Sequence, residues 1–284
     1  MKKYGIDKIP ERVIFLVVTL SLLVWSMTVL ADSSLHTNKQ ISMIMDGDHR
    51  SAANKARDRY RHPNETLSWL GIKPDMTVVE IFPGGGGWYT EILAPYLKDK
   101  GMFYAAGSDP ESSSSFSRKS ARAFKEKMAS NDVYSKVKIT ILAPPNKTAI
   151  APAGTVDAVL TFRNIHNWMK AGTADDVFNA MYSALKPGGI LGVIEHRGNS
   201  EIEQDPKAGS GYINQDYAIK LAEKAGFVFV SSSEINANPK DSKDHHKGVW
   251  TLPPTLAMKK KDREKYLAIG ESDRFTLKFI KPAK

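Results

Sequence analysis

One stretch in the first third of the chain constrains its fold more than any other. Four consecutive glycines, Gly84 to Gly87, follow a short apolar run that contains one carboxylate, Glu80, and precede a segment with helical periodicity. The apolar run is typical of a buried parallel strand. Glycines at a strand-to-helix turn let the backbone approach a ligand closely, and a helix N-terminus offers unpaired N–H groups. The stretch therefore predicts half of a nucleotide-binding α/β motif.

The glycine spacing separates three kinds of nucleotide site. A dinucleotide fingerprint needs Gly-x-Gly-x-x-Gly, and Tyr89 stands where the third glycine belongs after Gly84 and Gly86. A phosphate-binding P-loop needs Gly-Lys-Ser/Thr, and no lysine follows these glycines. What remains is an acid, Glu80, four residues before a Gly-x-Gly. A tight strand-to-helix turn that binds nothing is the alternative.

The acid-x-x-x-Gly-x-Gly pattern resembles motif I of class I S-adenosylmethionine-dependent methyltransferases. The resemblance implies that the glycine turn passes under the methionine and ribose parts of S-adenosylmethionine. One residue departs from the family pattern, because Phe82 stands where the usual first glycine belongs. The residues that the resemblance places at the cofactor around this turn are Glu80, Pro83, Gly84, Gly85, Gly86, Gly87, Trp88, Tyr89 and Thr90.

Residues 1–31 are expected to be a secretory signal peptide. A basic leader precedes an apolar run over residues 13–24, and Val29-Leu30-Ala31 supplies small residues at a cleavage point. We therefore expect export to the periplasm, cleavage after Ala31 and no membrane span in the mature chain. The alternative is an inner-membrane anchor, because residues 13–30 are nearly long enough to cross a bilayer. The leader's basic residues are Lys2, Lys3, Lys8 and Arg12.

Composition narrows the function classes. The chain of 284 residues contains no cysteine, which excludes thiol nucleophiles and cysteine-bound metals. Its formal net charge is +9, and removing the leader leaves 36 basic and 29 acidic side chains, or +7. The basic residues are scattered apart from Lys259-Lys260-Lys261, so we expect no nucleic-acid partner.

The mature chain divides into a leader with a helical lid, residues 32–70, and a methyltransferase-like domain, residues 71–284. Residues 32–49 are expected to be mobile. Residues 50–70 have a helical pattern, with several charged side chains just before Pro63. Helices that precede motif I often lie over the cofactor in the family that the chain resembles, so the charged segment is a candidate lid. A solvated charged helix is the alternative.

The second strand, expected over Met102 to Ala106, lacks a residue that the family pattern supplies. There the resemblance implies an acid that holds the ribose hydroxyls, and this chain has Gly107. Asp109, two residues later, is the candidate substitute. Alternatively, Asp109 is a turn or helix-capping residue before Pro110.

A second segment with several polar and ionisable side chains follows the strand expected over residues 156–162. In an open α/β sheet, ligands bind beyond the carboxyl ends of the central strands, so the residues after Phe162 should face the glycine turn. His166 can act as a general base near neutral pH, and Asn164 can fix a polar atom. Arg163 can bind a carboxylate of the substrate or of the cofactor's methionine moiety. Phe162, Arg163 and Asn164 are candidate cofactor contacts, and a purely structural loop is the alternative.

The next strand repeats this arrangement. Leu185-Lys186-Pro187-Gly188-Gly189 resembles the turn found before the fifth strand in class I methyltransferases. After the strand expected over residues 190–194 come Glu195 and His196, a second acid–base pair aimed at the same crevice. His166, Glu195 and His196 are therefore the candidate catalytic residues. A salt-bridged network of Glu195, His196 and Arg197 is an alternative that does not exclude catalysis.

A long loop, residues 236–254, holds two acids and two adjacent histidines. Long internal loops are often functional, and a metal site is conceivable here. Adjacent histidines in a lysine-rich loop rarely bind one ion, so no metal centre is expected. The residues concerned are Asp241, Asp244, His245 and His246.

Together the elements over residues 78–282 follow the class I methyltransferase order. This predicts a Rossmann-like α/β fold with a seven-stranded, mostly parallel sheet, an antiparallel last strand over residues 274–280, and helices on both faces. Phrases such as Phe162-Arg163-Asn164-Ile165-His166-Asn167-Trp168 resemble those of a bacterial group of exported, predicted methyltransferases.

The expected function is S-adenosylmethionine-dependent methyl transfer to a small molecule. A non-catalytic exported binding protein on the same fold is the alternative, favoured by Phe82 and Gly107. A dinucleotide oxidoreductase is disfavoured by Tyr89 and by the missing ribose acid. The oligomeric state stays open.

The leader generates the first testable prediction. If residues 1–31 are removed on export, N-terminal sequencing of the protein from a bacterial periplasmic fraction should begin at Asp32. Protein that begins at Met1 and sediments with the membrane would instead show that residues 13–30 are kept as an anchor.

Overall fold

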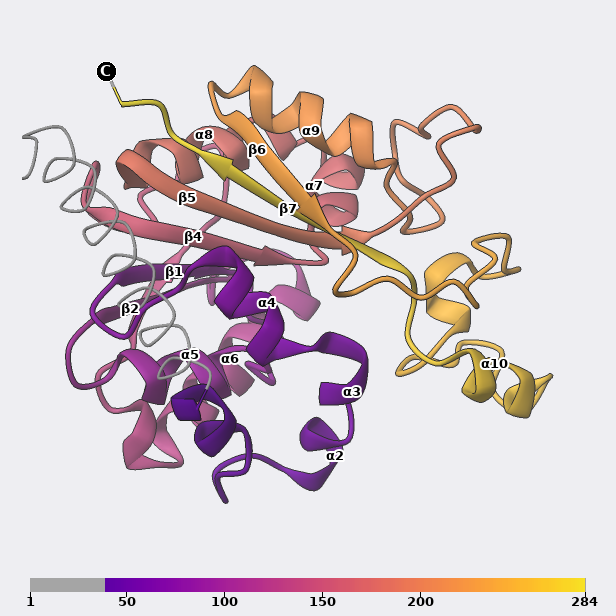
Figure 1. Ribbon diagram of the computed structural model, residues 1–284, viewed down its shortest axis with the longest axis horizontal. Helices are drawn as coiled ribbons and strands as arrows, with labels where there is room; N and C mark the ends of the chain where they lie inside the picture. Colours follow the sequence, from indigo (N-terminus) through magenta and orange to yellow (C-terminus); the bar gives the residue numbers. More distant parts are fainter. Residues whose placement is uncertain (1–38, 284) are drawn as a thin grey trace, which may run out of the picture.

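Alternating apolar strands and amphipathic helices build the α/β sheet that the sequence predicts. The structure, a computed structural model, describes residues 39–283, so the predicted signal peptide lies outside the described residues. Seven strands form one sheet in the order β3-β2-β1-β4-β5-β7-β6 (Figure 1). The strands are β1 Thr77–Ile81, β2 Met102–Gly107, β3 Lys138–Ile141, β4 Val156–Phe162, β5 Leu185–His196, β6 Val228–Ser233 and β7 Arg274–Ile280.

Only the last strand in sequence runs against the others. β7 lies between β5 and β6 and pairs antiparallel with both, whereas the other neighbouring strands pair in parallel. This is the Rossmann-like arrangement of class I methyltransferases, and the prediction of the fold is confirmed. Because β7 is reversed, its first residues lie at the carboxyl ends of the parallel strands.

Helices cover both faces of the sheet. Apolar residues of α4, α5 and α6 pack with β1, β2 and β4 in one cluster, and residues of α7, α8 and α9 pack in the other. The helices are α2 Ala52–Lys55, α3 Asp58–Arg61, α4 Pro63–Leu70, α5 Thr90–Leu97, α6 Ser115–Ala129, α7 Ile165–Ala171, α8 Ala174–Ala184, α9 Gln215–Lys224 and α10 Arg263–Ile269, with short 3-10 helices η1 Asp132–Tyr134 and η2 Gly248–Thr251.

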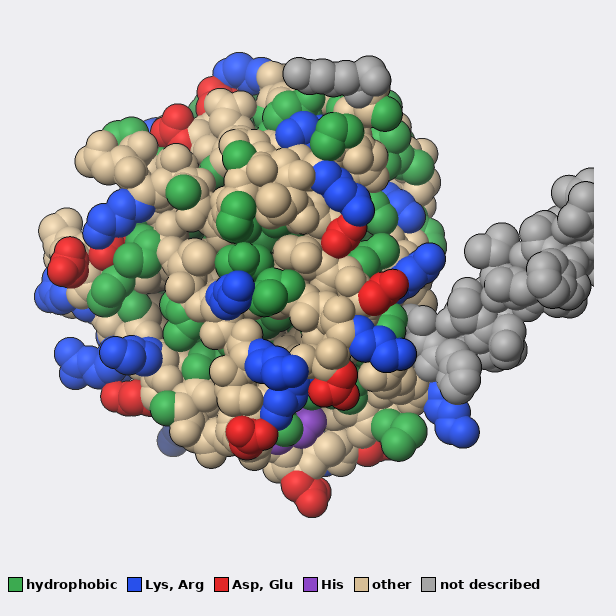
Figure 2. All heavy atoms as spheres, turned by 90° about the vertical axis from the view of Figure 1, so that its left-hand side faces the viewer, with side chains coloured by type: hydrophobic (Ala, Val, Ile, Leu, Met, Phe, Trp, Pro, Cys, Tyr) green, Lys and Arg blue, Asp and Glu red, His purple; other side chains and the backbone are tan. Residues whose placement is uncertain are grey.

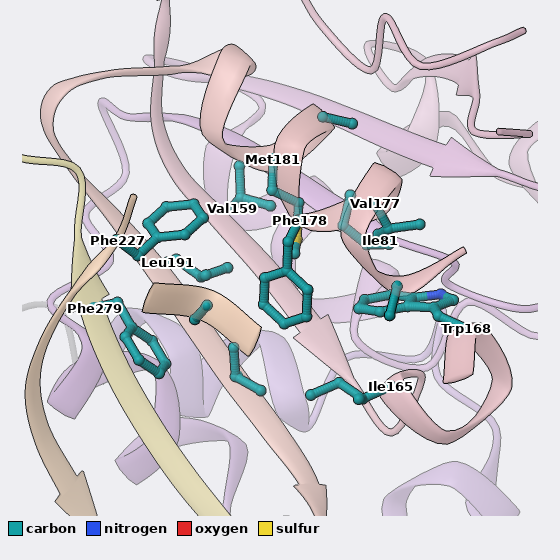
Figure 3. Close-up of a cluster of buried hydrophobic side chains, with 14 of the residues drawn as sticks. Ile81, Val159, Ile165, Trp168, Val177, Phe178, Met181, Leu191, Phe227 and Phe279 are labelled. Atoms are coloured by element: carbon teal, nitrogen blue, oxygen red, sulfur yellow. The ribbon is translucent and has the colours of Figure 1, made fainter. Parts of the chain in front are cut away.

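The larger apolar cluster holds α7 and α8 against the sheet. Phe178 of α8 is fully buried and meets Trp168 of α7 edge to face, with 5.9 Å between the ring centroids. Figure 3 shows Phe178 near Val159 and Leu191 of the central strands, and Trp168 near Ile81 and Val177. Trp168 thereby fixes α7, the helix that begins directly after β4 and carries His166.

Two expectations from the sequence are wrong. Residues 39–49 are not a mobile leader, because residues 39–45 are helical and Ile41 is fully buried in the cluster that holds α4 and α5. The turn expected over Leu185 to Gly189 lies within β5, where the register against β4 shifts next to Val156. The strand continues through the Pro-Gly-Gly segment as a bulge, since Gly188 pairs with Lys281 beyond β7.

The pairing of β1 with β4 brings the two chemically rich ends together. Ile81 lies opposite Thr161, and on the other side of β4 Phe162 lies opposite Ile194. The glycine turn, the loop after β4 and the end of β5 therefore share one edge of the sheet. The N-terminal helices and the segment with α10 lie beyond this edge (Figure 1).

No helix within residues 39–283 is long and apolar enough to cross a membrane. Seen from the left-hand side of Figure 1, the surface mixes Lys and Arg with Asp and Glu side chains (Figure 2). That face carries no continuous basic stripe, and the absence of a nucleic-acid partner stays a prediction.

The chain is strained at the first position of the glycine turn. Phe82, which stands where the family pattern has glycine, has φ of 46°. A side chain in this left-handed region costs roughly 1–2 kcal/mol relative to glycine. The Phe82 ring packs against the core near Trp168, with 6.5 Å between ring centroids, and this contact holds the strained backbone in place.

The strain at Phe82 predicts an unusual order of stability. Phe82→Gly should be more stable than Phe82→Ala by about 0.5 kcal/mol, because relief of the positive φ exceeds the unfolded-state entropy of glycine. Urea unfolding of both variants measures the difference. The matched control is Arg122, which is exposed on α6. There Arg122→Ala should be more stable than Arg122→Gly by about 1 kcal/mol. An alanine variant more stable at both positions would show that Phe82 is not strained.

Candidate functional site

The four glycines divide into two structural roles. A Cβ added to Gly85 would lie 3.0 Å from the Ala123 side chain, and one added to Gly87 would lie 3.0 Å from Phe124. These two glycines let the turn pack against α6. A Cβ on Gly84 or Gly86 would meet nothing within 4 Å, so these two face open space. The open pair is the part of the turn that a ligand can approach.

A cavity of about 270 Å³ borders Gly84, one of the two open glycines, and is lined mainly by apolar atoms. Gly107 borders it where the family pattern has an acid, and a Cβ there would also meet nothing within 4 Å. The space fits the adenosyl part of S-adenosylmethionine, but no carboxylate lines it to hold the ribose hydroxyls. Its walls include Pro83, Gly84, Gly107, Ser108, Phe124 and Ile141.

Asp109 does not stand in for the missing acid. Its Oδ1 accepts the Glu111 N–H at 3.0 Å, and its Oδ2 accepts from Lys147 Nζ at 2.7 Å. Ser108 and Pro110 line the cavity, whereas Asp109 does not. The structure therefore favours the alternative interpretation of Asp109 as a turn residue.

Glu80 lies buried beneath the glycine turn, and Thr90 at the start of α5 donates a 2.7 Å hydrogen bond to it. Burial raises the pKa of Glu80 to about 8, although the Thr90 hydrogen bond and the charges of Arg61 and Arg163 act to lower this pKa. The side chain is therefore largely uncharged at pH 7. It cannot serve as a counter-charge for its arginine neighbours.

Tyr89 and Phe162 join the glycine turn to β4. Their rings stack with 3.5 Å between centroids and 10° between planes, and both are buried. Both were predicted to contact the cofactor, but here each ring's face packs on the other. The stacked pair forms a rigid apolar wall beside the turn.

The segment predicted to form a lid lies on the glycine turn. The guanidinium carbon of Arg61 lies 4.5 Å from the centroid of the Trp88 ring, and that of Arg50 lies 5.2 Å from it. Trp88 Nε1 donates to the Asn54 carbonyl at 3.1 Å, and the Tyr89 hydroxyl donates to the Arg61 carbonyl at 3.3 Å. Arg61 is 1% exposed, so the alternative of a solvated charged helix fails for this residue.

The end of β5 orients His166. Glu195 is fully buried, and its Oε1 lies 3.3 Å from His166 Nδ1. The same carboxylate accepts the Ile165 N–H at 2.7 Å and the His196 N–H at 2.8 Å. A carboxylate beside Nδ1 favours the proton on that nitrogen and leaves the lone pair on Nε2. His166 therefore stays the candidate base, and Glu195 is the residue that orients its ring.

His196 is close by but uncharged. Its ring centroid lies 5.5 Å from that of His166, and its Nδ1 lies 2.5 Å from Ser272 Oγ. Burial, followed by the neighbouring His166 and Arg163, holds the pKa of His196 well below its usual value. Neutral at pH 7, His196 can accept or relay a proton but cannot act as a cationic acid.

The two residues after Phe162 have different surroundings. Asn164 Nδ2 donates to the Ile81 carbonyl at 3.0 Å and thereby ties the end of β1 to β4, which is a structural use. Arg163 has φ of 62° and is partly exposed, and its side chain makes no hydrogen bond or ion pair with residues 39–283. Arg163 is therefore available to a ligand.

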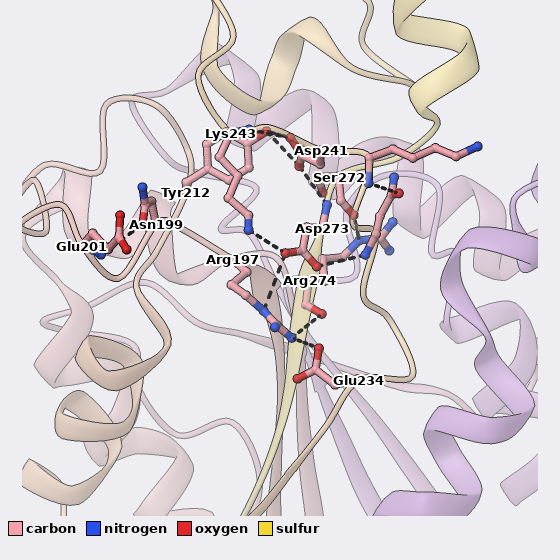
Figure 4. A network of polar contacts seen from close by, with 12 residues as sticks. Arg197, Asn199, Glu201, Tyr212, Glu234, Asp241, Lys243, Ser272, Asp273 and Arg274 are labelled. Carbon is pink, nitrogen blue, oxygen red and sulfur yellow. Dashed lines mark hydrogen bonds and ion pairs between the residues drawn. The ribbon is translucent and has the colours of Figure 1, made fainter.

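The acids and histidines of the 236–254 loop do not form a cluster with the spacing of metal ligands. Asp241 instead holds the loop in place by hydrogen bonds. Asp241 accepts from the Tyr212 hydroxyl at 2.9 and 3.0 Å, from the Asp273 N–H at 2.8 Å and from His245 at 2.9 Å (Figure 4). His246 is exposed. The loop also carries Trp250, whose ring centroid lies 6.0 Å from that of His166.

Outside the 236–254 loop, one group of side chains within residues 39–283 has the spacing of metal ligands. Donor atoms of His166, Glu195 and His196 lie within 4.8 Å of one another. Both oxygens of Glu195 already accept backbone N–H groups, and the nearby charges of Arg61 and Arg163 oppose a bound cation. The arrangement fits a hydrogen-bonded acid–base pair better than a metal centre, and the absence of a metal stays a prediction.

Sequence reasoning missed several residues that complete the edge. Glu271, Ser272 and Arg274 are buried at the start of β7, and Tyr212 and Trp250 flank the two histidines. A usable signal existed for the first group. An antiparallel last strand must begin at the carboxyl edge, so the polar run before residue 275 had to lie at the site.

Comparisons with known proteins support the fold. No family model and no curated protein sequence matches the chain. Among solved structures, a SAM-dependent methyltransferase from Aquifex aeolicus is 15% identical, covering 86% of this chain and 98% of its own, with a TM-score of 0.52. Geranyl diphosphate C-methyltransferase from Streptomyces coelicolor is 14% identical, covering 84% and 87%, with a TM-score of 0.53.

The same fold also carries other chemistry. The [4+2]-cyclase SpnF is 14% identical, covers 84% of this chain and 86% of its own, and has a TM-score of 0.54. At such identities the likeness establishes the fold alone, so activity must be argued from the site. The chain therefore has the fold of class I SAM-dependent methyltransferases, with open glycines and a carboxylate-oriented histidine on one edge of the sheet.

Proposed function

We propose that this chain is an S-adenosylmethionine-dependent methyltransferase whose small-molecule acceptor loses a proton as it is methylated. The observation that carries the proposal is the Glu195–His166 pair, which lies on the same sheet edge as the open glycines of the β1 turn. Glu195 occupies Nδ1 of His166, so Nε2 is the nitrogen that remains for the acceptor's proton.

Gly84 and Gly107 would hold the adenosyl part of the cofactor, because both line the cavity and leave room there. Gly86 is the second open position on the same turn. When bound, S-adenosylmethionine supplies a methyl group on a positively charged sulfur. Tyr89 and Phe162 form the stacked wall that fixes the width of the turn. The uncharged Glu80 supports the turn through Thr90 and places no negative charge under it at pH 7.

The protein's own groups then position and deprotonate the acceptor. Glu195 holds Nδ1 of His166, so Nε2 can take the proton that the nucleophilic atom loses. Trp250 packs against the His166 ring and Tyr212 against the His196 ring, which limits access of water. Most of the catalysis would come from holding the acceptor in line with the methyl group.

A second candidate is an exported ligand-binding protein on the same fold. Gly107 and the engaged Asp109 favour it, because no acid remains to hold the ribose hydroxyls. Export, which rests on residues 1–31 alone, also favours it, since an exported enzyme needs an outside supply of S-adenosylmethionine.

Cofactor binding is tested first at the glycine turn. Gly86→Val should abolish binding of S-adenosylmethionine and S-adenosylhomocysteine in calorimetry, because the added side chain fills ligand space, while its melting temperature stays near wild type. Gly85→Val is the matched contrast. It should melt earlier, because its Cβ meets α6 at 3.0 Å.

The same titrations separate the candidate functions. Wild type should bind both sulfur compounds and not NAD. Unchanged affinity in Gly86→Val would show that the turn is structural, and binding of NAD in place of the sulfur compounds would favour an oxidoreductase. If wild type binds none of these ligands, the binding-protein alternative stands.

The His166–Glu195 pair predicts a division of roles. His166→Gln should keep its melting temperature and cofactor affinity but lower turnover on the order of 10²-fold or more, as expected for a lost general base. Glu195→Gln should lose about 3 kcal/mol of stability, because the amide replaces a buried acceptor of the Ile165 and His196 N–H groups.

Thermal melts and cofactor titration test the stability half before the acceptor is known. The matched control is Glu234→Gln, since this carboxylate is 62% exposed and pairs with Arg197 at the surface. Its stability should change by less than about 1 kcal/mol. A His166→Gln variant that unfolds beside an unaffected Glu195→Gln variant would reverse the roles.

A further inference from the structure

Four arginines come from the N-terminal helices and from the carboxyl edge of the sheet, and three of them contact Glu271. The fourth, Arg163, follows Phe162, whose ring stacks on Tyr89, and the Tyr89 hydroxyl donates to the Arg61 carbonyl. Arg57 and Arg61 come from the segment around α3, Arg163 from the end of β4, and Arg274 from the start of β7. Their charges act on one another: burial first, and then the charge of Arg163, lowers the pKa of Arg61. Burial and then the charge of Arg274 lower the pKa of Arg163 to about 10. We refer to the four as the arginine cluster.

The arginine cluster has one carboxylate for its four positive charges. Glu271 accepts from Arg57 Nε at 2.5 Å, from Arg61 Nε at 3.3 Å and from Arg274 Nη2 at 2.9 Å. Among the groups that act on Arg61, Glu271 alone is negative. Glu80 is largely protonated at pH 7 and contributes little. A net charge of about +3 is therefore held at a mostly buried place, which is unfavourable without a counter-ion.

The same arginines carry hydrogen-bond donors without acceptors. Nη1 and Nη2 of Arg61 and Nη2 of Arg57 are buried and have no partner among residues 39–283. The Arg163 side chain, partly exposed, also makes no hydrogen bond there. Unpaired donors on a buried charged group are costly, and natural sites satisfy them with protein, water or ligand. Planar guanidinium groups suit the paired oxygens of a carboxylate or phosphate.

The methyl donor cannot supply the missing negative charge. S-adenosylmethionine carries a sulfonium and an ammonium group against one carboxylate, so its net charge is +1. Even if its carboxylate met one arginine, binding the donor would raise the total charge of the site. The negative charge must therefore come from the other ligand of the reaction.

We propose that the methyl acceptor is an anion whose phosphate or carboxylate group is bound by Arg61 and Arg163 of the arginine cluster. This inference rests on the proposed methyltransferase function and names its substrate class. It excludes cationic acceptors such as simple amines, which the cluster would repel. Arg163 lies two residues before Ile165, whose N–H Glu195 accepts, so Arg163 and the His166 base both follow β4 at the same edge of the sheet.

The test uses the mature chain and two probes, inorganic phosphate and S-adenosylhomocysteine. Phosphate should raise the melting temperature relative to chloride at equal ionic strength, and both ligands together should raise it further. Arg163→Gln should weaken phosphate binding on the order of 10-fold to 100-fold, as for a lost charge-assisted hydrogen bond. Its affinity for S-adenosylhomocysteine should change by less than about threefold. Citrate serves as the carboxylate probe in parallel.

Two further variants keep the result interpretable. Arg122→Gln removes the same charge from the exposed surface of α6 and should leave phosphate binding unchanged. Arg61→Met removes a buried charge with two unpaired donors, so it should fold, melt no earlier than wild type and lose the response to phosphate.

The outcomes separate this inference from the proposed function. Competition between phosphate and S-adenosylhomocysteine, with weaker binding of the latter in Arg163→Gln, would assign the cluster to the donor's carboxylate and overturn the inference. So would the lack of any response to phosphate and citrate. If wild type binds phosphate but not S-adenosylhomocysteine, the proposed function falls and the assignment to a methyl acceptor falls with it, while the anion site stands.

Discussion

The carboxylate of Glu195 is the interaction on which the site depends. It holds the first N–H of α7, the N–H of His196 and the Nδ1 of His166, all from the buried end of β5. The pairing of β5 with β4, and of β4 with β1, then sets the distance from His166 to the glycine turn. One buried acid, fixed in place by the register of the sheet, thus orients the ring of His166, the proposed base.

Electrostatic imbalance marks the site as strongly as geometry does. Burial keeps Glu80 and His196 largely uncharged at pH 7, while the arginines at the same edge stay charged in spite of it. A structural ion-pair network would bring its charges close to neutrality, whereas this edge keeps an excess of donors and positive charge. These uncompensated charges lower the stability of the folded protein at a place where a bound ligand can balance them.

The sequence predicted the strands and the placement of His166 well, because period-two and apolar patterns and the order of elements are local or topological signals. It failed where long-range packing decides. Residues 39–45 look like a leader until Ile41 is seen buried beside α4. Asp109 looked like a ribose ligand, and only the fold brings Lys147 to it. Arg274 could have been found only from topology, because an antiparallel β7 beside β5 begins at the carboxyl edge of the sheet.

The insertion of β7 between β5 and β6 has a consequence for the order of assembly. The contact from Arg57 to Glu271 joins residues 214 positions apart, so it has a very high contact order and closes nearly the whole chain into a loop. A polypeptide that ends before residue 271 already contains the glycine turn, His166 and Glu195, yet it lacks Glu271, the carboxylate that Arg57, Arg61 and Arg274 contact. The proposed anion site therefore forms only when segments far apart in the sequence meet.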